Sequence, residues 1–190
     1  MDDNTLALAT REKLPEALRV LLADYPRAAW EAHPNFSGLV QFWLERHLMF
    51  RKLLGLLQTD AAQRLDRAIA PDQYSARLGR FGSMLVEQLH GHHQIEDHHY
   101  FPQLRVLDPR LERAFDVLDR DHHAMDGLLN RFTEAANGVL LQPDEEQARE
   151  STARFDKELG SFQRMLDRHL CDEEEIIAPV ILKHGPGGLM

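Results

Sequence analysis

Six side chains with metal-binding chemistry interrupt otherwise apolar stretches of the 190-residue chain: His47, His92, Glu96, His122, His169 and Glu173. Glutamates at positions that the apolar pattern assigns to a core are costly, because a buried carboxylate must be paired, bound to a cation or protonated. A His-x3-Glu pair on a helix puts both side chains on one face, about 6 Å apart, where they can share a metal ion. These residue types therefore predict a metal centre inside the fold.

The order of these residues repeats along the chain. Segments 92–102 and 169–179 both have the pattern His-x3-Glu-x5-Pro, and His47 and His122 are each followed by two leucines at the same offset. The His-x3-acid spacing alone is weakly specific, since it occurs four times in this histidine-rich, acidic chain. The repeat is more specific, and it indicates two copies of one hairpin, each supplying one histidine and then His-x3-Glu.

Helices must position these residues, because no window of the sequence shows the sustained alternation of a strand. Four segments carry apolar residues in steps of three and four, the spacing of one helix face. We expect helices over about 36–69, 71–102, 109–138 and 143–179, with prolines marking most of their ends. The predicted fold class is all-α, an up-down-up-down four-helix bundle with short connections.

The positions of the four core histidines support antiparallel neighbours. In an antiparallel hairpin, two residues at the same height are equidistant from the turn. The midpoints between successive histidines fall at positions 69–70, 107 and 145–146, each beside a proline-marked break. One level of the bundle should therefore receive a histidine from every helix.

A shorter segment precedes the bundle. Thr10 is expected to cap a helix that carries Leu14 and Leu18 on its apolar side and reaches about Ala23, before Pro26. We therefore expect one domain over residues 1–190. It would consist of a short N-terminal helix and lead-in over 1–34 and a bundle core over about 36–179.

Composition excludes several classes of function. The formal net charge is -9, from 22 Lys+Arg and 31 Asp+Glu, and no basic stripe occurs, so no nucleic-acid partner is expected. No apolar run approaches the roughly 20 residues of a membrane span, so no membrane association is expected either. The single cysteine, Cys171, cannot form an internal disulfide, and the N-terminal residues lack the pattern of an export signal. A cytoplasmic protein is expected.

Six ligands of this kind suit two metal ions better than one. Two histidines per ion and two bridging carboxylates would give each ion four protein contacts, and a solvent-derived oxo or hydroxo bridge would add a fifth. Each ion would keep an open position. Imidazole and carboxylate suit iron, manganese and zinc alike, so ligand type leaves the metal open.

The order His, His-x3-Glu, His, His-x3-Glu on four helices resembles the hemerythrin-like family, the HHE cation-binding domain. The segments HHQIEDHHYFP, DHHAMD and HLCDEEEIIAP are similar to its motifs, and the resemblance covers about residues 36–179. It implies a non-haem di-iron centre that meets dioxygen, peroxide or nitric oxide. It further implies that His47 and His92 hold one iron, that His122 and His169 hold the other, and that both glutamates of the repeat bridge them.

The sequence departs from the oxygen-carrying hemerythrins at two places. Those proteins have another histidine four residues after the one on the third helix, where this chain has Asp126. They also end with His-x4-Asp, whose offset here falls on Glu174, whereas the internal repeat favours Glu173. Without the additional imidazole, both irons would have openings, which favours reaction over reversible oxygen carriage. Asp126 is expected at the surface or beside a ligand.

The expected function is reaction with, or sensing of, oxygen species, and peroxide breakdown is its most concrete version. The partner would be a small molecule, namely dioxygen, peroxide or nitric oxide. Three alternatives belong to other classes: a protein that binds dioxygen or nitric oxide without turnover, a protein that stores or delivers iron, and a plain helical bundle without metal.

Residues near the repeat leave further alternatives open. His99 shares the predicted helix face and could be a seventh ligand, a partner of a ligand or a pH-sensitive group. Tyr100 could donate a hydrogen bond or an electron, or simply pack. The spacing of His93 and Asp97 offers a second ligand register on the neighbouring face. The acidic run 172–175 is expected to be mostly a solvated face.

Overall fold

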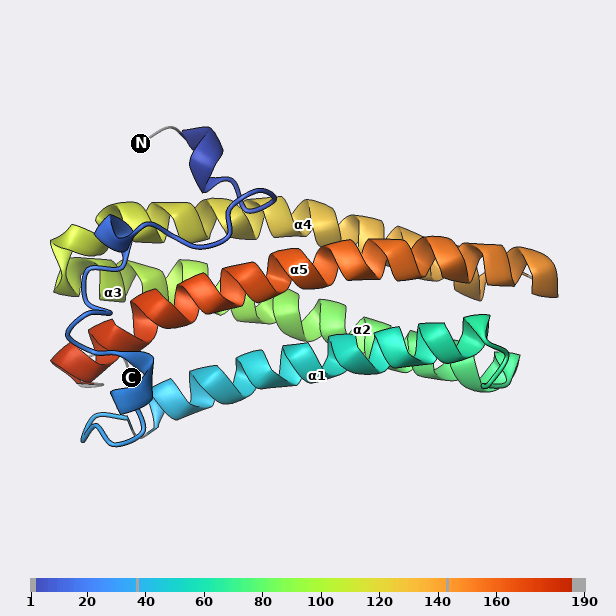
Figure 1. Cartoon of the computed structure of the whole chain (residues 1–190), viewed down its shortest axis with the longest axis horizontal. Helices are drawn as coiled ribbons and strands as arrows, with labels where there is room; N and C mark the ends of the chain where they lie inside the picture. The colour runs from blue at the N-terminus through green and yellow to red at the C-terminus, as the bar shows by residue number, and fades with distance from the viewer. Residues whose placement is uncertain (1–2, 37, 143, 186–190) are drawn as a thin grey trace. The chain divides into compact units, whose positions relative to one another are not determined.

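The computed structural model describes residues 3–36, 38–142 and 144–185 (Figure 1). These residues form helices and turns, with no strand among them. The long helices are α1 (Leu39–Leu65), α2 (Pro71–Ile95), α4 (Glu112–Leu140) and α5 (Glu145–His184). The short elements are η1 (Asp3–Leu6), η2 (Glu16–Leu18), η3 (Arg27–Ala29), η4 (Glu96–Tyr100), α3 (Phe101–Leu107) and η5 (Pro109–Leu111). The predicted all-α helical bundle is confirmed.

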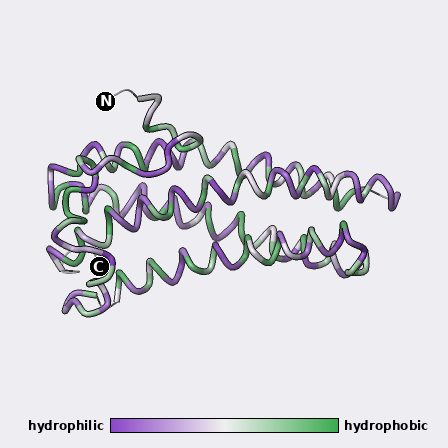
Figure 2. Tube along the Cα trace, viewed as in Figure 1, coloured by the Kyte–Doolittle hydropathy of each residue, from purple (hydrophilic) through white to green (hydrophobic). Residues whose placement is uncertain are grey.

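Each long helix buries the face that the apolar steps predict. Figure 2 shows that hydrophobic and hydrophilic residues alternate every few positions along the helices, as expected of amphipathic helices. The largest fully buried side chains are aromatic residues and leucines, and they include Phe50, Tyr74, Phe115 and Phe155. None of the helices in the described ranges is both long and apolar enough to cross a membrane.

Local signals set two of the helix ends. Helix α1 ends where Arg67 takes a left-handed φ of 59° and the Ala68 amide donates to the Gln63 carbonyl at 2.7 Å, a common way to close a helix. Helix α5 begins directly after Asp144. The Oδ1 atom of Asp144 accepts hydrogen bonds from the backbone amides of residues 146 and 147 at 3.0 Å each and so caps the first turn. Pro143, the expected break before this helix, lies outside the described residues.

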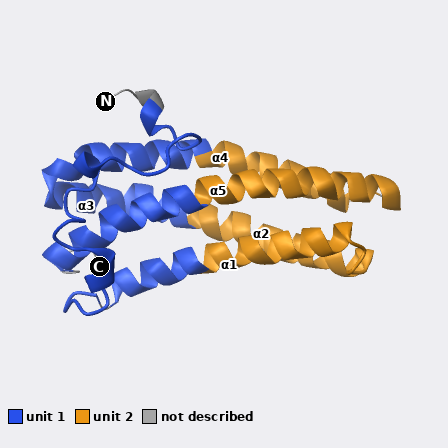
Figure 3. Cartoon of the chain, viewed as in Figure 1, with its two compact units in different colours: residues 1–48, 92–124, 167–190 blue, residues 49–91, 125–166 orange. Residues whose placement is uncertain are grey.

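Packing divides the chain into two compact units (Figure 3). Unit 1 consists of residues 1–48, 92–124 and 167–190, and unit 2 consists of residues 49–91 and 125–166. Each long helix contributes residues to both units. All six predicted metal ligands belong to unit 1, so the geometry of the candidate site can be described within that unit.

Unit 2 joins neighbouring helices through aromatic packing and ion pairs. Phe132 on α4 packs against Phe155 and Phe162 on α5, with ring centroids 5.4 and 5.6 Å apart. Arg77 on α2 donates to Asp60 on α1 at 2.7 Å. Aromatic packing therefore links α4 with α5, and an ion pair links α1 with α2.

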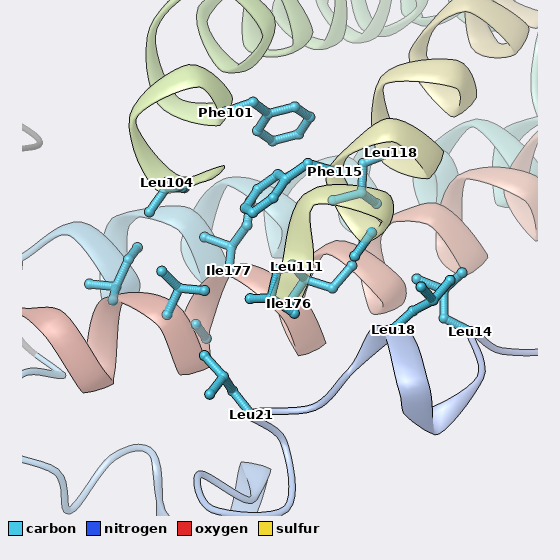
Figure 4. Close-up of a cluster of buried hydrophobic side chains, with 14 of the residues drawn as sticks. Leu14, Leu18, Leu21, Phe101, Leu104, Leu111, Phe115, Leu118, Ile176 and Ile177 are labelled. Carbon is cyan, nitrogen blue, oxygen red and sulfur yellow. The ribbon is translucent and has the colours of Figure 1, made fainter. Parts of the chain in front are cut away.

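Unit 1 adds the N-terminal segment to its helices. Figure 4 shows Leu14 and Leu18 of that segment in one cluster of buried side chains with Leu111, Phe115 and Ile176. Trp30 is also buried in this cluster, and its indole N–H donates to the Tyr25 carbonyl at 2.8 Å. The segment before α1 is therefore part of the core of this unit.

The expected helix from Thr10 to about Ala23 is wrong in its extent, because only η2 forms as a short 3-10 turn. Pro15 disfavours helical backbone at Leu14, the residue before it. The Leu14 amide instead donates to Asp172 Oδ1 on α5 at 3.2 Å. The apolar side of the segment was predicted correctly, since its leucines are buried.

Two prolines that were expected to end helices do not. Helix α2 passes directly into the π-helical turn η4 and then into α3. Pro102 lies in the first turn of α3, a position where the missing backbone N–H of proline is tolerated. Pro179 lies inside α5, which continues to His184. Residues 176–182 are all buried, so tertiary packing outweighs the local cost of the proline there.

The core of unit 1 should be sensitive to truncation of Phe115, which is fully buried and packs against Phe101 with ring centroids 5.4 Å apart. Phe115→Ala should lower the free energy of unfolding by about 3–5 kcal/mol, since it leaves a cavity. Val106→Ala, at a side chain 74% exposed, should change it by less than about 0.5 kcal/mol. Urea denaturation measures both, and equal losses would contradict the assigned core.

Candidate metal centre

The structure brings all six sequence-predicted residues together in one cluster within unit 1. They come from α1 (His47), α2 (His92), η4 (Glu96), α4 (His122) and α5 (His169 and Glu173). None of the six is more than 9% exposed. The helical periodicity and the internal repeat thus identified residues that converge in space although 126 positions separate the first from the last.

The four histidines form two pairs. The Nε2 atoms of His47 and His92 lie 3.2 Å apart, and those of His122 and His169 lie 3.1 Å apart. Two imidazole nitrogens about 2.1 Å from one ion, with a right angle between them, would lie about 3 Å apart. Each pair therefore has the spacing of two neighbouring ligands of one metal ion.

Glu96 reaches both pairs with its two oxygens. Oε1 lies 3.0 Å from His92 Nε2, and Oε2 lies 3.6 Å from His122 Nε2. Glu96 is the first residue of the π-helical turn η4, a local widening of the helix that is frequent at functional sites. Its carboxylate is therefore placed to bridge the two halves of the cluster.

Glu173 reaches both pairs with one oxygen. Its Oε2 lies 3.4 Å from His47 Nε2 and 3.5 Å from His169 Nε2. Its Oε1 accepts a hydrogen bond from the Trp43 indole at 2.6 Å. The tryptophan therefore fixes the orientation of this carboxylate and leaves the other oxygen facing the histidines.

Acidic residues that follow the two glutamates orient two of the histidines. Glu174 Oε1 lies 3.0 Å from His47 Nδ1, and Asp97 Oδ1 lies 2.6 Å from His122 Nδ1. An ionised carboxylate can only accept, so Nδ1 carries the hydrogen in both rings, and Nε2 presents a lone pair to the cluster when the ring is neutral. Glu174 and Asp97 occupy equivalent positions of the repeat, and the sequence analysis assigned neither of them this role.

His169 is oriented in a similar way by the residue that precedes His122. Asp121 is buried, and its Oδ2 lies 3.4 Å from His169 Nδ1. The Nε2 atom of His169 is therefore also free to act as a ligand. Carboxylates behind metal-bound histidines are the usual partners that fix the ring and its tautomer.

The interior of the cluster holds acceptors that face one another. Both oxygens of Glu96 and Oε2 of Glu173 are buried, and no hydrogen-bond donor reaches them within the described residues. The imidazole lone pairs oriented by the outer carboxylates face the same space. Buried acceptors repel one another unless a proton or a cation lies between them. The donor set therefore fits a metal ion.

Burial and the neighbouring charges also shift the pKa values of the glutamates and histidines in the cluster. Burial, followed by the neighbouring Glu173 carboxylate, raises the pKa of Glu96 well above its ordinary value. Burial also raises the pKa of Glu173, but His47 outweighs it, and the net pKa lies well below the ordinary value. Burial lowers the pKa of His92 to about 3 and also lowers that of His169. These imidazoles are therefore neutral at pH 7, which is the form that binds metals.

His93 is the one further histidine buried beside the cluster in the described ranges. Its ring stacks on His122, with centroids 4.1 Å apart and 13° between the planes, and neither of its nitrogens has a hydrogen-bond partner there. One nitrogen each of His93, His122 and His169 lie within 4.8 Å of one another. The alternative register with Asp97 is not formed as a ligand pair, since Asp97 contacts His122 instead.

The π-helical turn explains where His99 lies. An ordinary helix would put His99 on the same face as His92, but η4 inserts an additional residue and rotates His99 outward. His99 is exposed and contacts Gln103, which does not favour the alternative in which it is a seventh ligand. Tyr100 packs edge-to-face on Trp43 with centroids 4.8 Å apart, and Asp126 is exposed.

The expectation of a solvated acidic face at 172–175 is wrong, because residues 172–174 are buried. The N-terminal segment covers them with three arginines, so that Arg11 pairs with Asp172, Arg27 with Glu174 and Arg19 with Glu175. Asp172 and Glu174 are tolerated away from water because each has an arginine beside it.

A family model described as the hemerythrin HHE cation binding domain matches residues 38–181, which is more than half of the chain. The match includes all six residues of the cluster, and it does not include the segment before residue 38. No curated protein and no solved structure matches the chain.

The metal-free protein should become more stable at neutral pH when Glu96 is replaced by glutamine. Because the pKa of Glu96 is raised in the folded state, the folded protein retains a proton that the unfolded chain loses above about pH 4.5. The stability from this group is thus fully present at low pH and decreases as pH rises, by up to about 1.4 kcal/mol per pH unit. In denaturation of chelator-treated protein between about pH 4 and pH 7, the free energy of unfolding of the wild type relative to that of Glu96→Gln should decrease as pH rises, because the buried histidines contribute alike to both proteins.

Glu87→Gln is the matched control, because Glu87 lies exposed on α2, the helix that leads into η4 and Glu96. This variant should retain the pH dependence of the wild type. If Glu96→Gln also retained it, the buried and protonated state assigned to Glu96 would be incorrect.

Proposed function

The chain belongs to the hemerythrin HHE cation-binding family, and from this membership we propose that it is a non-haem di-iron protein that reacts with oxygen species, with peroxide breakdown as its concrete reaction. One observation carries the proposal. Four imidazole Nε2 atoms and two glutamate carboxylates face one buried space in which no donor reaches three of the carboxylate oxygens among the described residues. Such a space favours a bound cation.

Two ions are favoured over one because the potential ligands form two groups. One group contains His47, His92, Glu96 and Glu173, and the other contains His122 and His169 with His93; within each group the ligand atoms lie within 4.8 Å of one another. Under the proposal, each histidine pair holds one iron and the two glutamates lie between them. The two negative charges of the glutamates would then be compensated by the two cations.

Iron is the metal we propose, with zinc and manganese as alternatives that the donor atoms also suit. Bound iron would supply the redox changes that reactions of dioxygen, peroxide or nitric oxide require, whereas zinc has no redox chemistry. The breakdown of two peroxide molecules into two waters and one dioxygen balances by itself, because one peroxide is oxidised and the other is reduced. It therefore needs no external electron donor.

The protein contributes binding, orientation and exclusion of water. Glu174, Asp97 and Asp121 hold three imidazoles with Nε2 inward, and Trp43 holds Glu173. Burial of the cluster keeps bulk water and larger molecules away, so a substrate of a few atoms is favoured over a larger one. Two of these supporting side chains, Trp43 and Glu174, also line a small apolar pocket.

Metal loading and peroxide turnover test the proposal. Protein loaded with ferrous iron should carry about two irons per chain, absorb in the near ultraviolet through charge transfer once air has oxidised the iron to the ferric state, and release oxygen from added peroxide. Glu96→Gln should lose at least one iron and lower the rate of oxygen release at least about tenfold, since it removes a bridging charge. The control variant Glu87→Gln should behave like the wild type.

The same measurements separate the alternative functions. Full iron loading with a spectral response to dioxygen or nitric oxide, but no oxygen release from peroxide, would contradict the enzyme and indicate a binding protein. Iron that a mild chelator removes within seconds, with no response to either gas, would indicate storage or delivery. Folded protein that takes up no metal would overturn the whole proposal.

A further inference from the structure

The N-terminal segment inserts a charged side chain beside the candidate metal centre, although it precedes the part of the chain that the family model matches. The Arg11 side chain is only 1% exposed. Its Nη1 donates to Asp121 Oδ1 at 2.9 Å, its Nη2 donates to Asp121 Oδ2, and its Nε donates to Asp172 Oδ2 at 2.8 Å. Nη1 also donates to the Leu6 carbonyl at 2.7 Å. The buried guanidinium is therefore extensively hydrogen-bonded.

The carboxylate that Arg11 holds also lies against His169. Asp121 Oδ2, which accepts from Arg11, lies 3.4 Å from His169 Nδ1. A continuous set of contacts therefore leads from Arg11 through Asp121 to one histidine of the second pair.

A second arginine of the same segment makes an equivalent connection to the other pair. Arg27 Nη2 donates to Glu174 Oε2 at 2.7 Å, and Glu174 Oε1 accepts from His47 Nδ1 at 3.0 Å. One histidine of each pair is thus backed by a carboxylate that an arginine of the N-terminal segment also holds. The two connections differ in exposure, since the Arg27 side chain is 50% exposed.

Charge on the outer carboxylate controls how strongly the imidazole donates electrons. A carboxylate behind a metal-bound histidine draws its Nδ1 hydrogen and makes the ring a better donor. An arginine on that carboxylate takes part of its charge and weakens this effect. Burial would raise the pKa of Asp121, but Arg11 and His169 outweigh it and hold that pKa below its ordinary value.

We propose that the N-terminal segment tunes the metal centre through Arg11 and Arg27, which act as positioning residues by way of the carboxylates of Asp121 and Glu174. Loss of either arginine lets its carboxylate draw more strongly on the Nδ1 hydrogen of the histidine that it contacts. The ring then donates more charge and favours the more oxidised metal. Arg11 has the larger effect, because its buried charge is screened less than the half-exposed charge of Arg27.

The segment also offers a matched control. Arg19 pairs with Glu175 on α5 at 2.5 Å. Within the described part of the chain, Glu175 makes no hydrogen bond to the six-residue cluster. Arg19→Gln thus removes an ion pair between the same two elements without changing a carboxylate that backs a histidine.

Proton resonances of the histidine Nδ1–H groups test the proposal in zinc-loaded protein, and in metal-free protein if zinc does not bind. Arg27→Gln should shift the His47 resonance downfield, because its acceptor becomes stronger, and should leave that of His169 in place. Arg11→Gln should shift the His169 resonance and leave that of His47 in place. Arg19→Gln should shift neither. Equal shifts in all three variants, or none in any, would overturn the proposal.

The iron-loaded protein supplies a second measurement, which rests on the proposed function. At the midpoint potential of the wild type, the ferric-to-ferrous ratio should rise about tenfold in Arg11→Gln, less in Arg27→Gln, and not in Arg19→Gln. If Arg11→Gln does not fold, Arg27→Gln alone tests the proposal, because substitution of the half-exposed Arg27 side chain should not prevent folding. Failure of iron loading with the selective resonance shifts intact would reject the di-iron function and retain the tuning. An unchanged ferric-to-ferrous ratio in a loaded Arg27→Gln variant would reject the tuning.

Discussion

The burial of two carboxylates among four imidazoles is the constraint on which unit 1 depends. Glu96 and Glu173 each contact both histidine pairs at 3.0–3.6 Å, and neither is exposed by more than 1%. Apolar packing alone does not compensate such groups, since a buried charge needs an opposite charge beside it. The outer carboxylates turn three imidazole lone pairs toward the same space, which adds further acceptors instead of donors. Folding and cation binding should therefore be linked in this protein, as in other sites where the ligands converge only in the native state.

Much of this centre was predictable because two local signals coincide. Helix periodicity specifies which positions face the core, and a polar residue at such a position needs a chemical reason. The repeat of His-x3-Glu then identifies which polar residues belong together. Asp97 and Glu174 carried a visible signal of the same kind, because an acid follows each glutamate at equivalent positions. The role of Glu174 was missed because periodicity assigned the acidic run of the last helix to solvent, and only the fold shows that another segment covers it. Asp97 was considered only as a ligand partner of His93.

Other features depend on contacts that have no local pattern. The π-helical turn at residues 96–100 redirects His99, and nothing in the residue types of that segment distinguishes it from an ordinary helix. The N-terminal segment shows helical spacing but follows the hydrogen-bonding needs of Asp172, which lies 158 positions from Leu14 in the sequence. Pro179 is a helix breaker by propensity and yet lies inside α5, because the residues around it are buried. In each case tertiary contacts outweigh local preference.

The division between the matched region and the N-terminal segment has a physical meaning for how such a centre can vary. Residues that contact a metal ion are constrained by its charge and geometry, so little freedom remains at the six positions of the cluster. The charges behind the ligands are less constrained, because many arrangements can hold a carboxylate in place. Arg11 and Arg27 act at that outer level and belong to a segment that precedes the family match. Differences in reactivity between chains that share this cluster should therefore arise more from the segment that covers it than from the ligands themselves.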